Sequence, residues 1–265
     1  MRQVGGLPVL GWPAFDGLGV DAWVTTRSGG VSTDGYAGLN LSFQVGDDGE
    51  RVLRNRRLLA AAIGAQPGDF VFCAQAHERS VQVVTADHRG RGTLSAADAL
   101  PGTDALVTDV PGVVLAVMAA DCVPLVLLDP VARVLAAVHA GWRGTVAGVT
   151  PAAVEAMTGL GADAERIVAG IGPAVHPDRY QVGAEVVTAA EEAFGPRAGE
   201  VVRPDGTGRW LFDLWRANHL QLRVAGVPDE RIHVADHETG PGTPFYSHRF
   251  EAPCGRFAAV ARLTA

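Results

Sequence analysis

The chain has 265 residues, of which 48% are hydrophobic and 19% are charged. This composition excludes a disordered chain, and the length suits one large domain or two small ones. The 22 basic residues are outnumbered by 29 acidic ones, so the formal net charge is −7. That sign excludes a general binder of nucleic acid or of an anionic membrane and favours small, locally recognised ligands.

The absence of one basic residue type and the number of cysteines exclude further classes of reaction and of fold. The sequence contains no lysine, which excludes Schiff-base, pyridoxal-phosphate and P-loop chemistry. Three cysteines, an odd number in a long chain, argue against a disulfide scaffold and for a reducing compartment. The first residues lack the apolar run of a signal peptide, and we therefore expect a cytoplasmic protein.

We expect residues 1–265 to form one domain, because no linker, charge block or repeat divides the sequence. In chain order, apolar runs and helical periodicity first predict a strand at 22–26, a helix at 50–63 and strands at 70–74, 81–84, 113–119, 123–128 and 134–138. They then predict a helix at 146–157, a strand at 167–171 and a helix at 184–194. The last two predicted elements are a helix that is capped by Asp213 and ends at Gly226, and a strand at 257–263.

The apolar region from Val110 to Leu128 is the longest in the chain, but it contains Asp121 and two prolines. We therefore interpret it as two buried strands and not as a membrane span, where a charge and helix breakers would be costly. The alternation of elements predicts an α/β domain with mixed β-sheets flanked by helices.

Three metal-capable side chains each lie at the end of a predicted buried strand: His77, Cys122 and His139. Two imidazoles and one thiolate form a zinc set that leaves the fourth tetrahedral position free, as catalytic sites do and closed structural sites do not. The same trio would bind copper, although Met118, the candidate for a weak axial ligand, fits such a site only loosely.

The pattern by itself leaves other interpretations of these residues open. The three positions are far apart in the sequence and suit ordinary core residues as well. Cys122 and His139 also suit the nucleophile and base of a cysteine hydrolase that needs no metal.

Charged residues near the trio favour a functional site. Asp121 lies inside an apolar run, where a carboxylate has to be paired or hydrogen-bonded, and a helix cap or an ion pair with Arg143 is the structural alternative. Four arginines lie beside glycine or serine in predicted loops, where a guanidinium can hold a phosphate or a carboxylate: Arg27, Arg143, Arg249 and Arg256.

A series of short blocks along the chain resembles a known family. They are residues 25–32, 40–41, 45–47, 75–77, 120–125, 139–145, 171–173, 213–218, 247–249 and 255–256, of which Ala120-Asp121-Cys122 and His139-Ala140-Gly141-Trp142-Arg143-Gly144 are the most specific. The sequence resembles the multicopper polyphenol oxidase "laccase domain" proteins, the YfiH/YlmD family of purine nucleoside phosphorylases. The blocks span about residues 23 to 263.

The resemblance implies a single α/β domain similar to the catalytic fold of the cytotoxic necrotizing toxins. It also implies zinc at His77, Cys122 and His139, phosphorolysis of adenosine, inosine and methylthioadenosine, and adenosine deamination as a second activity. Purine nucleosides and phosphate are therefore the expected partners, and neither nucleic acid nor membrane is expected.

Within the matched blocks we assign further roles. In deamination, water activated by zinc would attack C6 of the purine while Asp121 moves protons. In phosphorolysis, Arg27 and Arg143 are the candidates for holding phosphate. We assign substrate contacts to Asn40, Gln75 and Arg249.

The chain departs from the family's pattern at two places. Arg179-Tyr180 stands where the family often has Cys-Tyr, and Glu238-Thr239 stands where Cys-Thr is frequent. Neither pair contains one of the three expected ligands, but both bear on the nucleoside pocket and hence on substrate preference. A copper-dependent polyphenol oxidase, a metal-free cysteine hydrolase using Cys122 and His139, and a non-catalytic interaction protein are the alternative functions.

Overall fold

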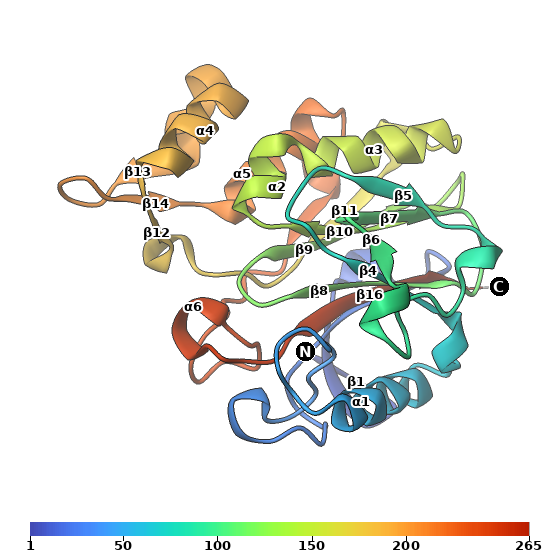
Figure 1. The fold of residues 1–265 in the computed structure, drawn as a ribbon. Helices are drawn as coiled ribbons and strands as arrows, with labels where there is room; N and C mark the ends of the chain where they lie inside the picture. The colour runs from blue at the N-terminus through green and yellow to red at the C-terminus, as the bar shows by residue number, and fades with distance from the viewer. Residues whose placement is uncertain (265) are drawn as a thin grey trace.

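Two β-sheets packed face to face form the centre of the protein, with helices on the outer face of each (Figure 1). The structure, a computed structural model, describes residues 1–264. Residue 265, the last residue of the expected domain 1–265, lies outside the described residues. The order of layers is therefore helix, sheet, sheet, helix, as expected for an α/β domain with mixed sheets.

The first sheet has seven strands in the order β1-β2-β3-β16-β8-β4-β6. β4 runs parallel to both β8 and β6, and the other neighbours are antiparallel. The bounds are β1 Arg2–Val4, β2 Leu7–Gly11, β3 Val20–Thr25, β4 Phe70–Ala74, β6 Leu100–Pro101, β8 Val114–Ala119 and β16 Phe257–Leu263.

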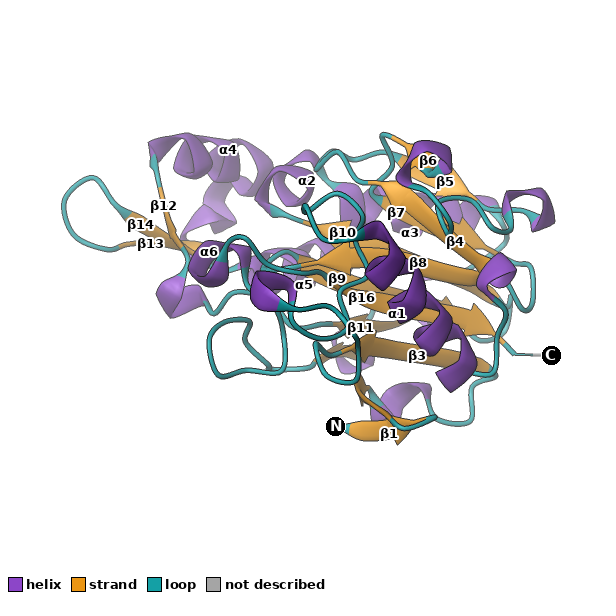
Figure 2. Cartoon of the chain, turned by 60° about the horizontal axis from the view of Figure 1, so that its bottom comes forward, coloured by secondary structure: helices purple, strands orange, loops and turns teal. Residues whose placement is uncertain are grey.

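The second sheet has six strands in the order β15-β11-β9-β10-β7-β5. The bounds are β5 Val81–Val83, β7 Ala105–Thr108, β9 Val123–Asp129, β10 Val134–Ala140, β11 Val168–Ile171 and β15 Ile232–Val234. A third sheet of three short strands, β12 Gln181–Val182, β14 Trp210–Phe212 and β13 Val202–Pro204, lies with α4 at one end of the molecule (Figure 2).

The helices are α1 Gly49–Ala62, α2 Trp142–Ala147, α3 Val149–Gly159, α4 Ala184–Phe194, α5 Leu214–Val224 and α6 His248–Glu251. α1 covers the outer face of the first sheet, and α3 and α5 cover that of the second. Short 3-10 helices lie at Pro13–Phe15, Asp34–Tyr36, Pro67–Asp69, Ala86–His88, Ala96–Asp98, Ala164–Arg166, Pro177–Arg179, Gly195–Glu200 and Asp229–Arg231. None of the helices in residues 1–264 combines the length and the apolar character that crossing a membrane requires.

The alternation of side chains explains why the central strands are apolar throughout. In β8, Leu115 and Val117 point into the layer between the sheets, whereas Val114 and Ala116 pack beside Leu59 of α1. In β10, the even-numbered residues pack toward α3 and α5, and the odd-numbered Leu135 and Ala137 point into the same central layer. Because both faces of these strands are buried, neither shows a polar alternation.

One connection between the sheets positions the candidate metal ligands. β8 belongs to the first sheet and β9 to the second, so the three residues between them, Ala120, Asp121 and Cys122, cross from one sheet to the other. Backbone in this crossing lies at the edge of the central layer, where side chains can reach a cleft without disturbing either sheet.

The predicted α/β class with mixed sheets and flanking helices is confirmed, as are all the predicted strands, with shifts of one or two residues at some ends. The single helix predicted at 146–157 was wrong. The structure has α2 and α3 instead, because Gly148 adopts φ +86°, a left-handed conformation that ends α2 and redirects the chain. The similarity to the toxin fold stays a prediction.

Candidate metal centre and active site

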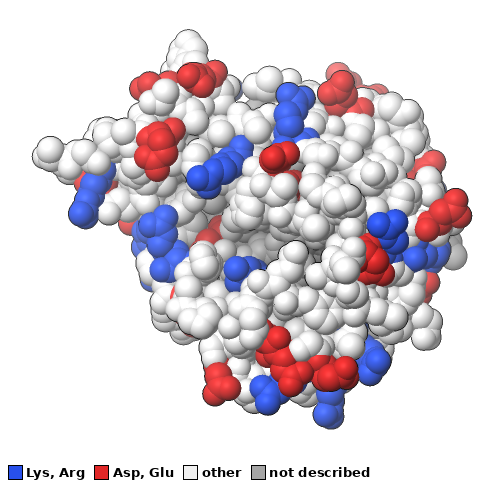
Figure 3. Space-filling model, viewed as in Figure 1, with Lys and Arg blue, Asp and Glu red and all other residues white. Residues whose placement is uncertain are grey.

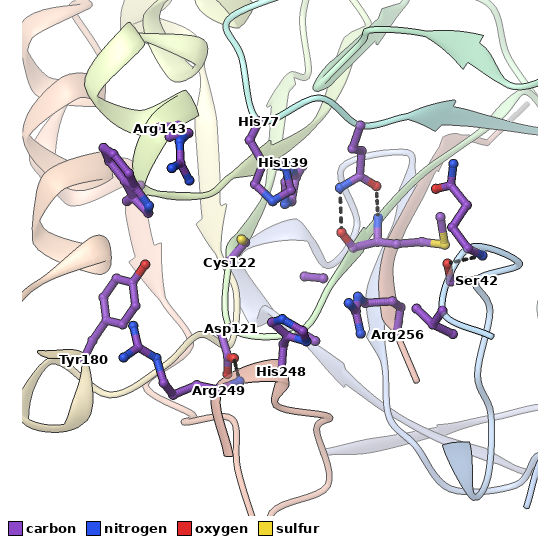
Figure 4. Close-up of a pocket in the computed structure, with 17 residues that line it drawn as sticks. Ser42, His77, Asp121, Cys122, His139, Arg143, Tyr180, His248, Arg249 and Arg256 are labelled. Atoms are coloured by element: carbon purple, nitrogen blue, oxygen red, sulfur yellow. Dashed lines mark hydrogen bonds between the residues drawn. The ribbon is translucent and has the colours of Figure 1, made fainter. Parts of the chain in front are cut away.

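The structure brings together the three side chains expected to bind metal. The ligand atoms of His77, Cys122 and His139 all lie within 4.8 Å of one another (Figure 4). The two imidazole rings are 4.8 Å apart between centroids and nearly perpendicular, at 84°. Ligands of one tetrahedral ion bound at 2.0 to 2.3 Å lie about 3.3 to 3.8 Å apart, so a small closure would complete a zinc site.

Each ligand is delivered by the end of a central strand. His77 follows β4, Cys122 precedes β9, and His139 is the last but one residue of β10. His77 has φ +62° and the neighbouring Asp121 has φ +88°, both unusual for residues with a side chain. Such backbone strain persists only where surrounding contacts hold it, and it is concentrated at functional sites.

Asp104 holds two of the three candidate ligands in place through hydrogen bonds. Its carboxylate is fully buried and accepts backbone N–H bonds from Ala76 (3.1 Å), His77 (3.0 Å) and Glu78 (2.8 Å). The Nδ1 atom of His139 also donates to Asp104 Oδ1, at 2.8 Å. This bond leaves Nε2 of His139 free to bind a metal, the usual arrangement of a carboxylate behind a histidine ligand.

Gly141 provides the space beside the ligands. A Cβ atom at this position would lie 2.9 Å from the sulfur of Cys122 and 2.9 Å from Cδ2 of His77. Any larger residue would therefore displace two ligands. The donor set, the oriented imidazole and the cleared space together fit a bound zinc ion.

The charges of the trio are coupled. Burial would raise the pKa of the Cys122 thiol, but the His139 and His77 rings outweigh it and lower this pKa to about 6. Burial would lower the pKa of His139, but the Cys122 thiolate and the Asp104 carboxylate outweigh it and raise this pKa. A thiolate is thus available near neutral pH, which both metal binding and nucleophilic attack require.

The trio lines a cavity of about 400 Å³. Figure 4 shows the cavity from one side, and Figure 3 shows the same region as a hollow in the face of the molecule with both basic and acidic residues around it. One end of the cavity carries aromatic rings and guanidinium groups, from Trp142, Arg143, Tyr180 and Arg249. The other end is formed by Ser42, Gln44, Val45, Gln75 and Met118, and Figure 4 shows Arg256 beside Ser42 at this end.

Asp121 lines this cavity and also forms hydrogen bonds to two other segments beside it. Its Oδ1 accepts a hydrogen bond from the Thr239 hydroxyl (2.5 Å), and its Oδ2 accepts one from the backbone N–H of Arg249 (2.7 Å). The pairing with Arg143 considered from the sequence is absent from the described residues. Asp121 instead fixes the start of α6 beside Cys122.

The structure separates the arginines that the sequence grouped together. Arg143 and Arg249 line the cavity, as does Arg256, whose Nη1 donates to the carbonyl of Cys254. Arg27 does not line it. Its guanidinium pairs with Glu251 of α6 at 2.9 Å and lies over the ring of Tyr246.

Asn40 and Gln75 have polar atoms that are already engaged. The amide of Gln75 lines the cavity but exchanges two 2.8 Å hydrogen bonds with the backbone of Met118. Asn40 is fully buried and does not line the cavity. Its side chain bonds the backbone of Ser42 and of Arg256, two residues that do line it.

The two departures from the family's pattern meet in space. Arg179 and Glu238 form an ion pair of 2.9 Å, and the Arg179 guanidinium also lies over the ring of Phe250. Their neighbours in the chain are Tyr180, which lines the cavity, and Thr239, which binds Asp121. The pair therefore ties together two segments that form one wall of the cavity.

Sequence reasoning missed Asp104, Gly141 as a space-giving residue, and the aromatic wall of Trp142 and Tyr180. Asp104 had a usable signal, because an aspartate directly before the apolar run of β7 has to be satisfied when the strand is buried. Trp142 stands in a block that was recognised, but its orientation toward the cavity is a property of the start of α2.

Comparisons with known proteins show which family the chain belongs to. The family model for "multi-copper polyphenol oxidoreductase laccase" matches residues 21–264. A protein of Deinococcus radiodurans named purine nucleoside phosphorylase is 43% identical over 259 residues, which cover 97% of this chain and 94% of that protein. "Adenosine deaminase RL5", from an unknown prokaryotic organism, is 41% identical over 232 residues, which cover 87% of this chain and 88% of that protein.

A solved structure extends the similarity to the whole fold. The crystal structure of YlmD from Geobacillus stearothermophilus matches with a TM-score of 0.92 at 37% sequence identity, over 96% of this chain and 95% of that chain. The chain therefore belongs to the multi-copper polyphenol oxidoreductase laccase family, in which YlmD is one of its relatives.

Proposed function

We propose that this protein is a zinc-dependent purine nucleoside phosphorylase that acts on adenosine, inosine and methylthioadenosine and also deaminates adenosine. The observation that carries the proposal is the convergence of His77, Cys122 and His139 on one wall of a cavity large enough for a small ligand. The names of the relatives, purine nucleoside phosphorylase and adenosine deaminase, support both activities.

Zinc is the metal that the donor set favours, because two imidazoles, one thiolate and a free fourth position are typical of catalytic zinc. When bound, it would act as a Lewis acid beside the substrate. Asp104 holds the imidazole of His139 in the tautomer that leaves Nε2 for the metal. It also holds the backbone of His77, so both ligands are oriented before a metal arrives.

The two reactions make different demands on the chain. In phosphorolysis an oxygen of phosphate bonds to C1′ while the bond from C1′ to N9 breaks, and its electron pair leaves with the purine, which then takes up a proton. In deamination water adds to C6 and ammonia leaves. Asp121 is our candidate for moving these protons, since each carboxylate oxygen retains a lone pair beyond the bonds from Thr239 and Arg249.

Among the residues assigned to substrate, Arg143 and Arg249 have side chains in the cavity and are proposed to contact the ligand. Asn40 and Gln75 are proposed to act as positioning residues, because their amides are bonded to the backbone that forms the cavity. Arg27 is proposed to act through Glu251 and α6, and not by contact with phosphate.

The test is alanine replacement of each ligand in turn: His77→Ala, Cys122→Ala and His139→Ala. Each variant should lose bound zinc, measured by elemental analysis, and lose both cleavage of inosine in phosphate and deamination of adenosine. His88→Ala, which removes a half-buried imidazole outside the cavity, is the matched control and should keep both. Cleavage of inosine by Cys122→Ala at the wild-type rate would contradict the proposal.

The family's description favours a second candidate, a copper-dependent polyphenol oxidase. Within residues 1–264 the His, Cys, Asp and Glu side chains converge in one group of three or more, whereas a multicopper oxidase needs several copper ions. Oxygen uptake with a phenol, together with copper in the isolated protein, would support this candidate over ours.

The lowered pKa of Cys122 favours a third, a cysteine hydrolase with His139 as base. Such an enzyme would keep its activity after complete removal of metal by a chelator and lose it on alkylation of the thiol. Our proposal requires the opposite response to chelation.

A further inference from the structure

His248 is a cavity residue that takes no part in the metal site or in the substrate contacts assigned above. It lines the same cavity as His77, Cys122 and His139. Figure 4 shows its imidazole on the side of the cavity opposite His77 and His139. The cavity has a volume of about 400 Å³, which suits one small ligand, so a ligand beside the metal position also contacts the wall that His248 forms.

The backbone of His248 is held in place because its helix, α6, is anchored at two residues. Arg249, the next residue, donates its backbone N–H to Asp121 Oδ2 at 2.7 Å. Glu251, at the end of the helix, pairs with Arg27 at 2.9 Å. Because Asp121 is the neighbour of a metal ligand in the chain, these contacts fix where α6 presents His248 to the cavity.

The imidazole of His248 has no hydrogen-bond or ion-pair partner within residues 1–264, although it faces the cavity. By contrast, the imidazoles of His88, His139 and His176 each form a hydrogen bond with another residue. Both ring nitrogens of His248 are therefore available to a ligand. An imidazole can hold a proton near neutral pH and also give it up, which makes it the most common general acid in enzymes.

The other side chains of the cavity are poorly suited to giving a substrate a proton near neutral pH. The three candidate ligands are committed to the metal when it is bound, and guanidinium groups keep their protons. Burial raises the pKa of the Tyr180 hydroxyl, so this group also keeps its proton. Asp121 accepts both of its hydrogen bonds, as an ionised carboxylate does, and in that form it has no proton to give.

We infer that His248 is the general acid that protonates the leaving purine in phosphorolysis, an assignment that rests on the proposed function. As an oxygen of phosphate bonds to C1′, the bond from C1′ to N9 breaks and its electron pair moves onto the purine. The proton of the His248 imidazolium passes to N7, so a neutral base leaves and a neutral imidazole remains. His248 is exposed and regains its proton from solvent.

The proton transfers of the two reactions are thus divided between two residues. His248 gives the proton that the purine takes up in phosphorolysis, and Asp121 accepts the proton that water loses in deamination. The two residues are linked, since the bond from Arg249 to Asp121 holds the helix that carries His248.

The experiment compares two nucleosides in the zinc-loaded protein. The purine of inosine needs a proton to leave, whereas 7-methylinosine carries a methyl group and a positive charge at N7, so its purine leaves without one. In His248→Gln we expect kcat for inosine in phosphate to fall about 100-fold or more, because glutamine transfers no proton. The kcat for 7-methylinosine should stay within about threefold of the wild type. Liquid chromatography of the released base measures both rates.

His237→Gln is the matched control, because it replaces an exposed histidine outside the cavity, and it should leave both rates unchanged. His248→Gln should also keep the zinc content of the wild type by elemental analysis and its midpoint of urea unfolding. Loss of zinc from this variant would make His248 a metal ligand and would overturn the assignment.

The other outcomes separate the two proposals. An equal loss of rate with both nucleosides would show that His248 positions the substrate and does not donate the proton. An unchanged rate with inosine would show that the proton comes from elsewhere. Either result overturns the role of His248 while the proposed function stands. If the wild type cleaves neither nucleoside in phosphate, the proposed function fails and the role of His248 fails with it.

Discussion

Gly141 determines how closely the metal ligands can approach the start of α2. The absent side chain leaves room for the sulfur of Cys122 and the ring of His77. Both neighbours are the outer ends of side chains, so a methyl group at residue 141 would displace them at little cost to folding. Its backbone has φ −74°, which alanine adopts without strain.

We therefore expect Gly141→Ala to weaken zinc binding by about tenfold or more while the free energy of unfolding of the metal-free protein changes by less than about 1 kcal/mol. Competition with a chelator measures the first and urea unfolding the second. Gly159→Ala is the control, because no atom lies within 4 Å of the added Cβ. Unchanged zinc affinity in Gly141→Ala would contradict the steric argument.

Asp104 acts at the same scale through hydrogen bonds. Asparagine has one acceptor oxygen and turns an NH₂ group toward the backbone donors, so Asp104→Asn would release His139 or the loop of His77. We expect zinc affinity to fall about 10- to 100-fold and the protein to lose about 1 to 3 kcal/mol of stability. Asp109→Asn, at an exposed position after β7, should show neither effect. The same chelator competition and urea unfolding decide between these outcomes.

At the scale of elements, the break between α2 and α3 lets the two helices contact different parts of the molecule. α2 is short and carries Trp142 and Arg143 to the cavity, whereas α3 packs Ala153 and Met157 against the second sheet. A continuous helix from residue 142 could not satisfy both directions. Gly148 makes the change of direction in a conformation that residues with a side chain rarely adopt.

Gly148→Ala should accordingly destabilise the protein by about 1 to 2 kcal/mol, because alanine is strained at φ +86°. The midpoint of urea unfolding at neutral pH reports the change. Gly159→Ala, a glycine in the last turn of α3 without positive φ, serves as the comparison and should lie within about 0.5 kcal/mol of the wild type or above it. Equal stability of the two variants would show that the break does not depend on glycine.

At the scale of the whole molecule, one buried carboxylate ties the turn after β9 to the segment that precedes β11. Asp129, at the end of β9, is fully buried and accepts backbone N–H bonds from Val131, Ala132 and Asp163. Arg166 pairs with it at 2.8 Å. Burial would raise the pKa of Asp129, but the Arg166 guanidinium and these N–H groups outweigh it and lower this pKa below its ordinary 3.8.

Because the folded protein binds this proton less readily than the unfolded chain, Asp129 contributes stability that is fully present above pH 3.8 and is lost as pH falls through the lower folded value. Asp129→Asn should cost about 2 to 3 kcal/mol at pH 7, and the gap to the wild type should narrow below pH 3.8. Urea unfolding at pH 7, 5 and 3 measures the difference in the free energy of unfolding between the variant and the wild type. Asp87→Asn, at an exposed position, should show no gap. If the difference in stability between Asp129→Asn and the wild type grew as the pH fell, the assigned direction of the Asp129 pKa shift would be wrong.

Local patterns in the sequence were sufficient for the longest strands and for α1, but not for β7 or for the break between α2 and α3. The runs at β8, β9 and β10 are apolar at every position, which is a local property of strands buried on both faces, and α1 shows the spacing of one buried stripe. The three candidate metal ligands could be predicted because each lies near the end of a predicted strand and in a block shared with a family. None of this required knowing which strands are neighbours.

Partner choice among distant residues was decided only by tertiary structure. Arg27 and Arg249 look alike in the sequence, yet Arg27 pairs with Glu251, 224 positions away, and only Arg249 reaches the cavity. Asp104 meets His139 because β7 and β10 are neighbours in one sheet, and Cys122 meets both histidines because the chain changes sheets beside it. Periodicity reports the environment of a backbone segment, whereas the contacts of a charged side chain depend on how all the layers pack.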